Sequence, residues 1–125
     1  MLKTYLLFLL VYILVDLVWI YGAQNMHLKM VQDVQGSSLS ANMYAALLYY
    51  LLAGLLFACI VKPYATTEKD VIKLAALLGL LMFGTFDLTN KALFKGYTWK
   101  YVILDMMWGV FSITLTSYIV WKANL

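Results

Sequence analysis

Four long apolar stretches, separated by short polar connections, divide the chain into residues 4–23, 42–61, 71–90 and 101–121. Each stretch is about 20 residues long, the length that an α-helix needs to cross the hydrocarbon core of a bilayer. A backbone in lipid must satisfy its hydrogen bonds within its own segment, so each stretch is predicted to be a membrane-spanning helix.

The connections predict how these helices are arranged. The first connection is the longest, and Met26, Met30 and Val34 recur in it every four residues, which predicts a short interfacial helix at about 25–35. The other two connections have ten residues or fewer, which makes neighbouring helices antiparallel. The expected fold is all-α: a single transmembrane domain over residues 1–125, built as an integral membrane four-helix bundle with up-down-up-down topology.

Local signals mark the ends and contacts of the helices. Ser40 is a predicted N-cap for the second helix, and Thr67, with Asp70 three residues later, is a predicted N-cap for the third. The small residues of Gly54-x-x-x-Ala58 and Ala75-x-x-x-Gly79 predict a close approach between these two helices.

The composition agrees with a membrane protein, since 65% of residues are hydrophobic and only 12% are charged. A soluble domain has about a quarter of its residues charged. The net charge of +3 comes from lysines, which suit lipid headgroups, and no basic run interleaved with aromatics suggests a nucleic-acid partner. The side of the termini has one lysine more than the other side, so the positive-inside rule predicts cytoplasmic termini. The lysines on the side of the termini are Lys3, Lys62, Lys69, Lys73 and Lys122, and those on the other side are Lys29, Lys91, Lys95 and Lys100.

Three aspartates lie inside the predicted spans, where a carboxylate costs a few kcal/mol. Asp16 and Asp87 lie near the ends of the first and third spans, and Asp105 lies near the start of the fourth. Because the fourth span runs back, all three are expected at one face of the membrane, roughly 5–10 Å below the interface at 1.5 Å per residue. They therefore form one predicted polar layer.

Other polar and aromatic residues fall at the same depth. We take as the candidate ligand-binding layer the residues Asp16, Trp19, Asn42, Asp87, Asn90, Asp105 and Trp108. Two plainer interpretations stand beside this one. Polar residues in membrane bundles often serve as interhelical hydrogen-bond partners, and tryptophans often form an interfacial belt.

The three acids differ in the partners that their own helices offer. Asp87 has Lys91 one turn later, so an ion pair is predicted, while Asp105 is close to Tyr101 and Lys100. Asp16 has no cation on its helix and must find a partner on another helix, carry a proton or meet a ligand. Asp16 is therefore the first functional candidate.

A short string occurs twice, as Tyr12-x-x-x-Asp16-x-x-Trp19 and Tyr101-x-x-x-Asp105-x-x-Trp108. The two spans are predicted to run in opposite directions, so the match is not a simple parallel repeat. The string shows only that each of these aspartates has an aromatic residue one helical turn away.

Motifs for metal or nucleophilic chemistry are missing from the sequence. It has no HExxH, no GxSxG, no Gly-rich phosphate loop and a single cysteine, Cys59. His27 lies on the side of the acids, and a carboxylate–His metal site is one alternative, although one histidine in a connection is a poor basis for it. We predict no metal site and no cofactor.

Several segments resemble one family. VDLVWIYG (15–22), NMYAALLYYLL (42–52), GTFDLTN (84–90) and LDMMWG (104–109) are similar to the family called domain of unknown function 2177, small predicted four-span membrane proteins. Phe86 stands where the family usually has Tyr. The resemblance implies the four-span architecture, singles out Asp16, Trp19, Asp87, Asn90, Asp105 and Trp108, and supplies no reaction.

Three functions remain open. The first is a binding or transport module that holds a proton, a cation or a small amine in the carboxylate layer. The second is an enzyme that acts on lipid with the carboxylates as general acid and base, and the third is a structural or assembly role. We favour the first and lean against an enzyme. The expected partners are membrane lipids and a second copy of the chain.

Overall fold

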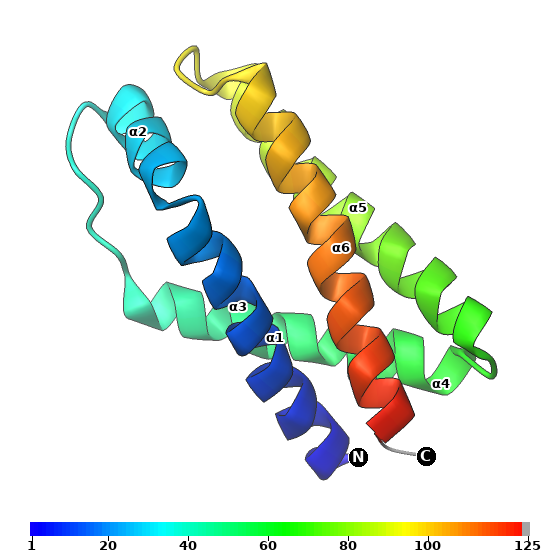
Figure 1. The fold of residues 1–125 in the computed structure, drawn as a ribbon. Coiled ribbons are helices and arrows are strands. Elements are labelled where there is room, and N and C mark those ends of the chain that lie inside the picture. The colour runs from blue at the N-terminus through cyan, green and yellow to red at the C-terminus, as the bar shows by residue number, and fades with distance from the viewer. Residues whose placement is uncertain (124–125) are drawn as a thin grey trace.

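The computed structural model describes residues 1–123, which form helices joined by short connections (Figure 1). In chain order the elements are α1 (Leu2–Gly22), α2 (Gln24–Gln35), α3 (Met43–Leu56), the π-helical turn η1 (Phe57–Val61), α4 (Lys62–Tyr64), α5 (Glu68–Leu93) and α6 (Trp99–Ala123). No strand occurs in this part of the chain. The predicted all-α class is confirmed.

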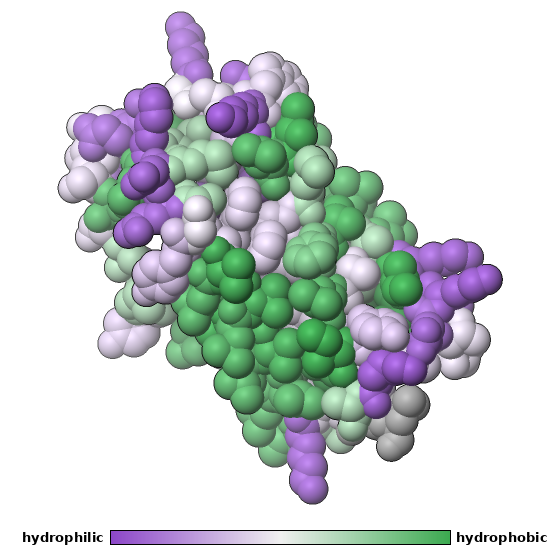
Figure 2. All heavy atoms as spheres, in the orientation of Figure 1, coloured by the Kyte–Doolittle hydropathy of each residue, from purple (hydrophilic) through white to green (hydrophobic). Residues whose placement is uncertain are grey.

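Four helices are long and apolar enough to cross a membrane: Leu2–Gly22, the continuous unit Met43–Tyr64, Glu68–Leu93 and Trp99–Ala123. They coincide with the four predicted spans, and the last two extend two or three residues beyond the prediction at each end. Hydrophilic residues gather over α2 at one end and over the α4–α5 connection at the other, with apolar surface between them (Figure 2). This distribution suits a chain that crosses a bilayer.

The helices pack as an up-down-up-down bundle in which the second unit is strongly tilted. α5 and α6 form a tight antiparallel hairpin, α1 packs along α6, and α3 crosses α1 at a steep angle (Figure 1). The second and third units meet where η1 contacts α5, but the two glycines of the predicted seam lie against other helices. Gly54 lies against Tyr5 and Leu9 of α1, and Gly79 lies against the backbone of Gly109 in α6.

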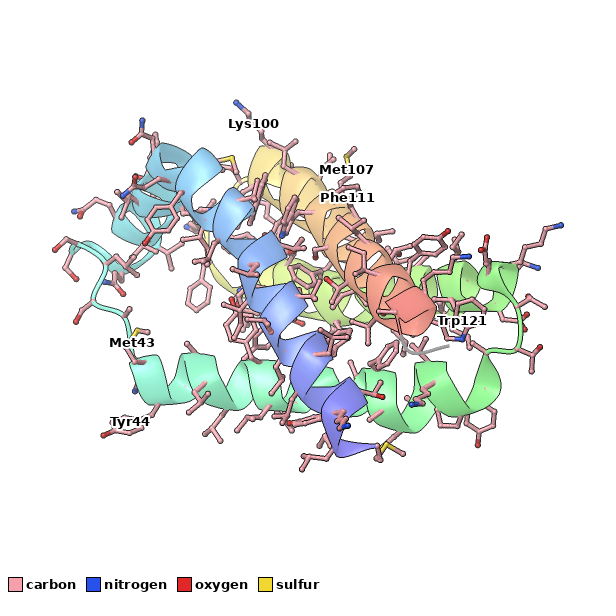
Figure 3. The ribbon with its side chains drawn as sticks, turned by 60° about the horizontal axis from the view of Figure 1, so that its bottom comes forward. Met43, Tyr44, Lys100, Met107, Phe111 and Trp121 are labelled. Atoms are coloured by element: carbon pink, nitrogen blue, oxygen red, sulfur yellow. The ribbon has the colours of Figure 1, made fainter. Side chains whose placement is uncertain are left out.

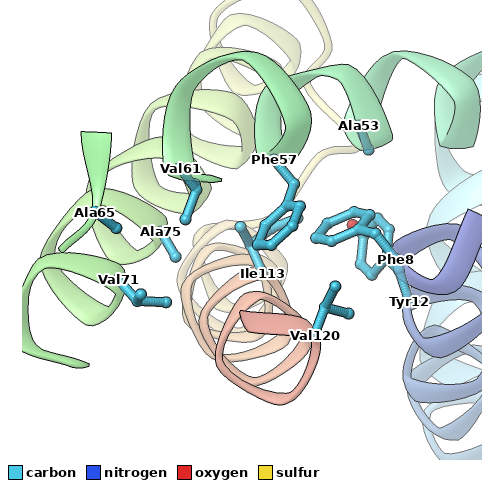
Figure 4. Close-up of a cluster of buried hydrophobic side chains, with 10 residues drawn as sticks. All are labelled: Phe8, Tyr12, Ala53, Phe57, Val61, Ala65, Val71, Ala75, Ile113 and Val120. Carbon is cyan, nitrogen blue, oxygen red and sulfur yellow. The ribbon is translucent and has the colours of Figure 1, made fainter. Parts of the chain in front are cut away.

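An apolar core joins the helices in the half of the bundle that contains the N-terminus. Phe8 of α1 stacks on Phe57, with ring centroids 5.1 Å apart, and Val61 and Val120 are buried in the same cluster (Figure 4). This core has no acidic member. The polar layer lies toward the other end of α1 and therefore has to be satisfied by its own contacts.

The ends of the helices follow local chemistry, with one difference from the prediction. Thr67 and Asp70 form the predicted capping box at the start of α5. The N-cap of α3 is Asn42 rather than Ser40, and the Asn42 side chain accepts a hydrogen bond from the Ala45 amide at 3.1 Å. Asn42 is exposed there, so this side chain serves a helix end.

The π-helical turn η1 ends at Val61, two residues before Pro63. Proline has no amide hydrogen, and its ring clashes with the carbonyl group four residues earlier in an ideal helix, here that of Cys59. A wider turn relieves such a clash and is a recognised adjustment within α-helices. Residues 43–64 thus remain one continuous helical unit, which ends where Ala65 becomes extended.

The short helix α2 is present where the sequence predicts it. Its residue Met30 is buried against Tyr97 and Val102, and the backbone at Asp33 lies close to Gly96. The apolar face of α2 therefore covers the α5–α6 connection. This contact places α2 over the end of the bundle that holds the three acids.

Candidate functional site

Asp16 is held by two helices other than its own. Its Oδ1 accepts the indole N–H of Trp108 in α6 at 3.0 Å, and its Oδ2 accepts the hydroxyl of Tyr50 in α3 at 2.5 Å. Of the three alternatives for this acid, the structure gives it partners on other helices. Both donors are neutral, and they leave the carboxyl group some of its acceptor capacity, since a carboxylate has about four acceptor positions.

Asp105 and Trp19 make the reciprocal contact. The Trp19 indole N–H donates to Oδ1 of Asp105 at 3.2 Å, so each helix gives its tryptophan to the acid of the other. The Trp19 and Trp108 rings stack between the two acids, with centroids 5.4 Å apart and planes inclined by 9°. This arrangement gives the repeated Asp-x-x-Trp string a physical meaning: along two antiparallel helices, equal spacing brings each acid opposite the other tryptophan.

Asp87 differs from the prediction. It is fully buried, and its Oδ1 accepts the hydroxyl of Tyr97 from the α5–α6 connection. Its Oδ2 has no hydrogen-bond donor, and the Asp105 carboxyl group lies beside the Asp87 side chain. Asp87 and Asp105 therefore form a contiguous pair of acids.

The predicted Asp87–Lys91 ion pair is not formed. The Lys91 ammonium lies over the Trp99 ring instead, 5.7 Å from its centroid. The physical reason is that Asp87 faces α6 in the interior, whereas a long lysine side chain can extend its charge toward water. Lys100, the other nearby cation, points away from the bundle (Figure 3).

The ion pairs of the structure lie outside the acid layer. Within residues 1–123 the two ion pairs are Lys29–Asp33 and Lys122–Glu68, and both are largely exposed. Thus no lysine among the described residues pairs with Asp16, Asp87 or Asp105.

Most of the groups that donate hydrogen bonds to the acids were not predicted from the sequence. Tyr50 and Tyr97 were not identified as donors, because each is far from its acid along the chain or lies beyond the helix end. His27 was predicted on the side of the acids, but no hydrogen-bond partner was predicted for it. In the structure, His27 Nε2 is 3.1 Å from the carbonyl oxygen of Trp19, and Nδ1 is 2.8 Å from the Tyr101 hydroxyl. A carbonyl group only accepts, so Nε2 carries a proton.

The structure brings together five of the seven candidate residues: Asp16, Trp19, Asp87, Asp105 and Trp108. Asn90 lies at the edge of this cluster, with its side chain near the Tyr97 hydroxyl. Asn42 is the exception, because it caps α3 and does not line the pocket beside the acids. We withdraw Asn42 from the candidate site.

A pocket of about 850 Å³ adjoins the cluster. Its polar and aromatic lining comes from five helices and includes Asp16, Trp19, His27, Tyr49, Tyr101 and Asp105. Exposed apolar side chains such as Tyr21, Leu39 and Phe86 also line it. No lysine belongs to this lining, and among the described residues no cluster of three or more His, Cys, Asp or Glu side chains suits a metal ion.

Comparisons with known proteins give one match. Searches among curated proteins and among solved structures each find no significant similarity. A family model described as "predicted membrane protein (DUF2177)" matches residues 1–122. The match covers nearly the whole chain and agrees with the four spanning helices, so this multi-pass membrane protein belongs to the DUF2177 family.

Proposed function

We propose that this membrane protein binds a small organic ammonium ion in the pocket between its helices, as a binding or transport module. The observation that carries the proposal is that Asp16 and Asp105 both line an apolar pocket of about 850 Å³ whose described lining contains no lysine. Two carboxyl groups without a lysine partner favour a positively charged ligand. Ligand pockets commonly occupy about 300–1,000 Å³, so the volume is suitable.

Aromatic rings support an organic cation over a bare metal ion. Trp19, Tyr49 and Tyr101 line the same pocket, and the faces of such rings attract ammonium groups. Hard cations such as Ca²⁺ instead take six or more oxygen ligands, and a zinc site needs a small set of His, Cys or carboxylate side chains. The mixture of carboxylates and aromatic rings suits a charged nitrogen on an apolar body.

The exposed apolar side chains of the lining suggest a route for such a ligand. Leu39 and Phe86 are at least half exposed, and both line the pocket. A ligand with an apolar body partitions into the bilayer, from which these side chains are accessible. Its charged end would then approach the acid layer near the membrane surface.

A structural role is favoured by a separate observation. The reciprocal Trp19–Asp105 and Trp108–Asp16 hydrogen bonds already join α1 to α6, and such contacts fix helix register without any ligand. The lipid-acting enzyme has less support, because the pocket lining contains no Ser, Thr or Cys nucleophile within the described residues.

The test uses benzyltrimethylammonium, a permanently charged probe, and neopentylbenzene, its uncharged counterpart of the same shape. The purified protein in detergent is heated with each compound while its tryptophan fluorescence is recorded. We expect only the cation to raise the midpoint of unfolding, and we expect the change Asp16→Asn to weaken its binding at least tenfold, about 1.4 kcal/mol.

Asp33→Asn is the matched control, because Asp33 is exposed and pairs with Lys29 outside the pocket. It should bind the cation as the parent does. If the cation and the uncharged compound stabilise the parent equally, or if Asp16→Asn binds the cation normally, the proposal is wrong and the structural role is favoured.

A further inference from the structure

We propose that Asp87 and Asp105 hold a single proton between their carboxyl groups, and that an organic cation entering the pocket displaces this proton. The first half depends only on the geometry of the pair. The second half rests on the proposed function, which supplies the cation. Together they make cation binding release one proton, although Asp87 itself does not line the pocket.

The proposed shared proton is supported first by the unpartnered oxygen of Asp87. Oδ2 of this fully buried side chain has no donor within residues 1–123, although buried polar atoms are normally paired. The group beside it is the carboxyl of Asp105, which is only 6% exposed. If both acids are ionised, two negative charges repel each other in a setting of low dielectric constant. One proton between them removes the repulsion and gives Oδ2 its missing hydrogen bond.

No lysine among the described residues faces the pair to replace that proton. The groups that face the pair from each packed element are Asp16 on α1, His27 on α2, Tyr49 on α3, Tyr97 in the α5–α6 connection and Tyr101 on α6. On α5 itself, Lys91 is turned to the Trp99 ring. The tyrosines are neutral, and the one basic ring, His27, is hydrogen-bonded to the Trp19 carbonyl and the Tyr101 hydroxyl.

Asp105 connects the pair to the pocket. It faces Asp87 on one side, and its carboxyl group belongs to the pocket lining on the other. A cation beside Asp105 supplies the positive charge that the shared proton supplied before. The O–H bond of the protonated carboxyl then breaks, its electron pair stays on oxygen, and the proton passes to water. One positive charge enters as one leaves, so the charge of the layer does not change.

The first measurement detects the proton without any ligand. Infrared spectra of the purified protein at neutral pH should contain the carbonyl stretch of a protonated carboxylic acid, shifted in heavy water. Asp87→Asn should remove this band, because the amide can bond both Tyr97 and Asp105 without a shared proton. Asp33→Asn should retain it. If Asp87→Asn does not fold, Asp105→Asn serves in its place, since it also removes one member of the pair.

The second measurement follows the proton during binding. The protein is titrated with benzyltrimethylammonium in a calorimeter, in buffers of different ionisation enthalpy, which gives the number of protons released on binding. The probe is a quaternary ammonium ion without an N–H proton, so any released proton comes from the protein. We expect about one proton released per bound cation in the parent and in Asp33→Asn, and none per bound cation in Asp87→Asn. Binding without release in the parent overturns the displacement.

The two proposals fail in different ways. If the parent binds no cation, the proposed function fails and the displacement with it, but the infrared band still decides whether the pair holds a proton. The shared proton is wrong if the parent lacks the infrared band. It is also wrong if the band survives in both Asp87→Asn and Asp105→Asn, and either outcome holds even if the cation binds.

Discussion

At the scale of single residues, the acid layer is stabilised by donors that carry no charge. A tryptophan indole has one N–H donor and no acceptor, and here Trp19 and Trp108 each give that donor to an aspartate on the other helix. Hydrogen bonds to a charged group are stronger than those between neutral groups. A carboxylate held in this way stays available to a cation, whereas one paired with lysine would already be neutralised.

Removal of a single indole donor should therefore weaken the protein. In Trp108→Phe the ring and its stacking on Trp19 are largely kept, but Asp16 loses one of its two donors. We expect a loss of about 0.5–2 kcal/mol in stability, measured by thermal unfolding in detergent. Trp99→Phe is the control, because Trp99 is 60% exposed and no acid accepts its N–H in the described structure. Equal losses in the two variants would contradict a specific role for the Asp16 contact.

At the scale of helices, the α5–α6 hairpin depends on glycine. Gly79 lies against the Gly109 backbone so closely that an added Cβ would stand 2.6 Å from the Gly109 carbonyl oxygen and 3.0 Å from the Val110 Cα. The obstructing atoms are backbone, which cannot rotate away as a side chain can. The close approach also brings the two helices that carry Asp87 and Asp105 together.

Alanine at Gly79 should thus separate these helices, whereas alanine at Gly22 should not. We expect Gly79→Ala to cost about 1–3 kcal/mol of stability, as overpacking typically does. Gly22→Ala is the matched control, because an added Cβ there meets nothing within 4 Å. The measurement is thermal unfolding of both variants in the same detergent. A Gly79→Ala protein as stable as Gly22→Ala would show that the hairpin packs more loosely than described here.

At the scale of the whole molecule, the two halves of the bundle differ in character. One half holds the apolar cluster around Phe8 and Phe57, and the other holds the acid layer under α2 (Figures 1 and 4). In the apolar half, close packing is supplemented by hydrogen bonds such as that from the Tyr5 hydroxyl to the Leu51 carbonyl. Packing matters there because lipid is as apolar as the core and supplies no hydrophobic force between helices. The polar half can therefore carry the groups that would bind a ligand.

The up-down-up-down arrangement makes a prediction about access from the two sides of the membrane. In a Cys59→Ala background, single cysteines at Lys3 and Lys122 should react with an impermeant maleimide from one side, and cysteines at Asp33 and Lys95 from the other. The lysine count predicts that the first pair faces the cytoplasm. Labelling of intact cells is compared with labelling of opened cells. Reaction of Lys3 and Lys95 positions from the same side would contradict the four-span topology.

The sequence by itself determined the helices, their number and the end of the bundle at which the acids lie. Apolar runs of about 20 residues have one stable backbone solution in lipid, and the caps at Thr67 and the break after Pro63 are local effects. Because short connections reverse the chain, the positions of Asp16, Asp87 and Asp105 along their spans were enough to place them at one end.

Only the tertiary structure decided which groups meet within that layer. The rotation and tilt of each helix depend on packing between segments far apart in the chain, so periodicity alone could not pair Trp108 with Asp16 or Tyr97 with Asp87. The local rule that predicted an Asp87–Lys91 pair failed because the close α5–α6 contact at Gly79 and Gly109 lets Asp87 be buried beside Asp105, while Lys91 reaches outward. The sequence thus determined at which end of the bundle the acids lie, and packing determined their partners.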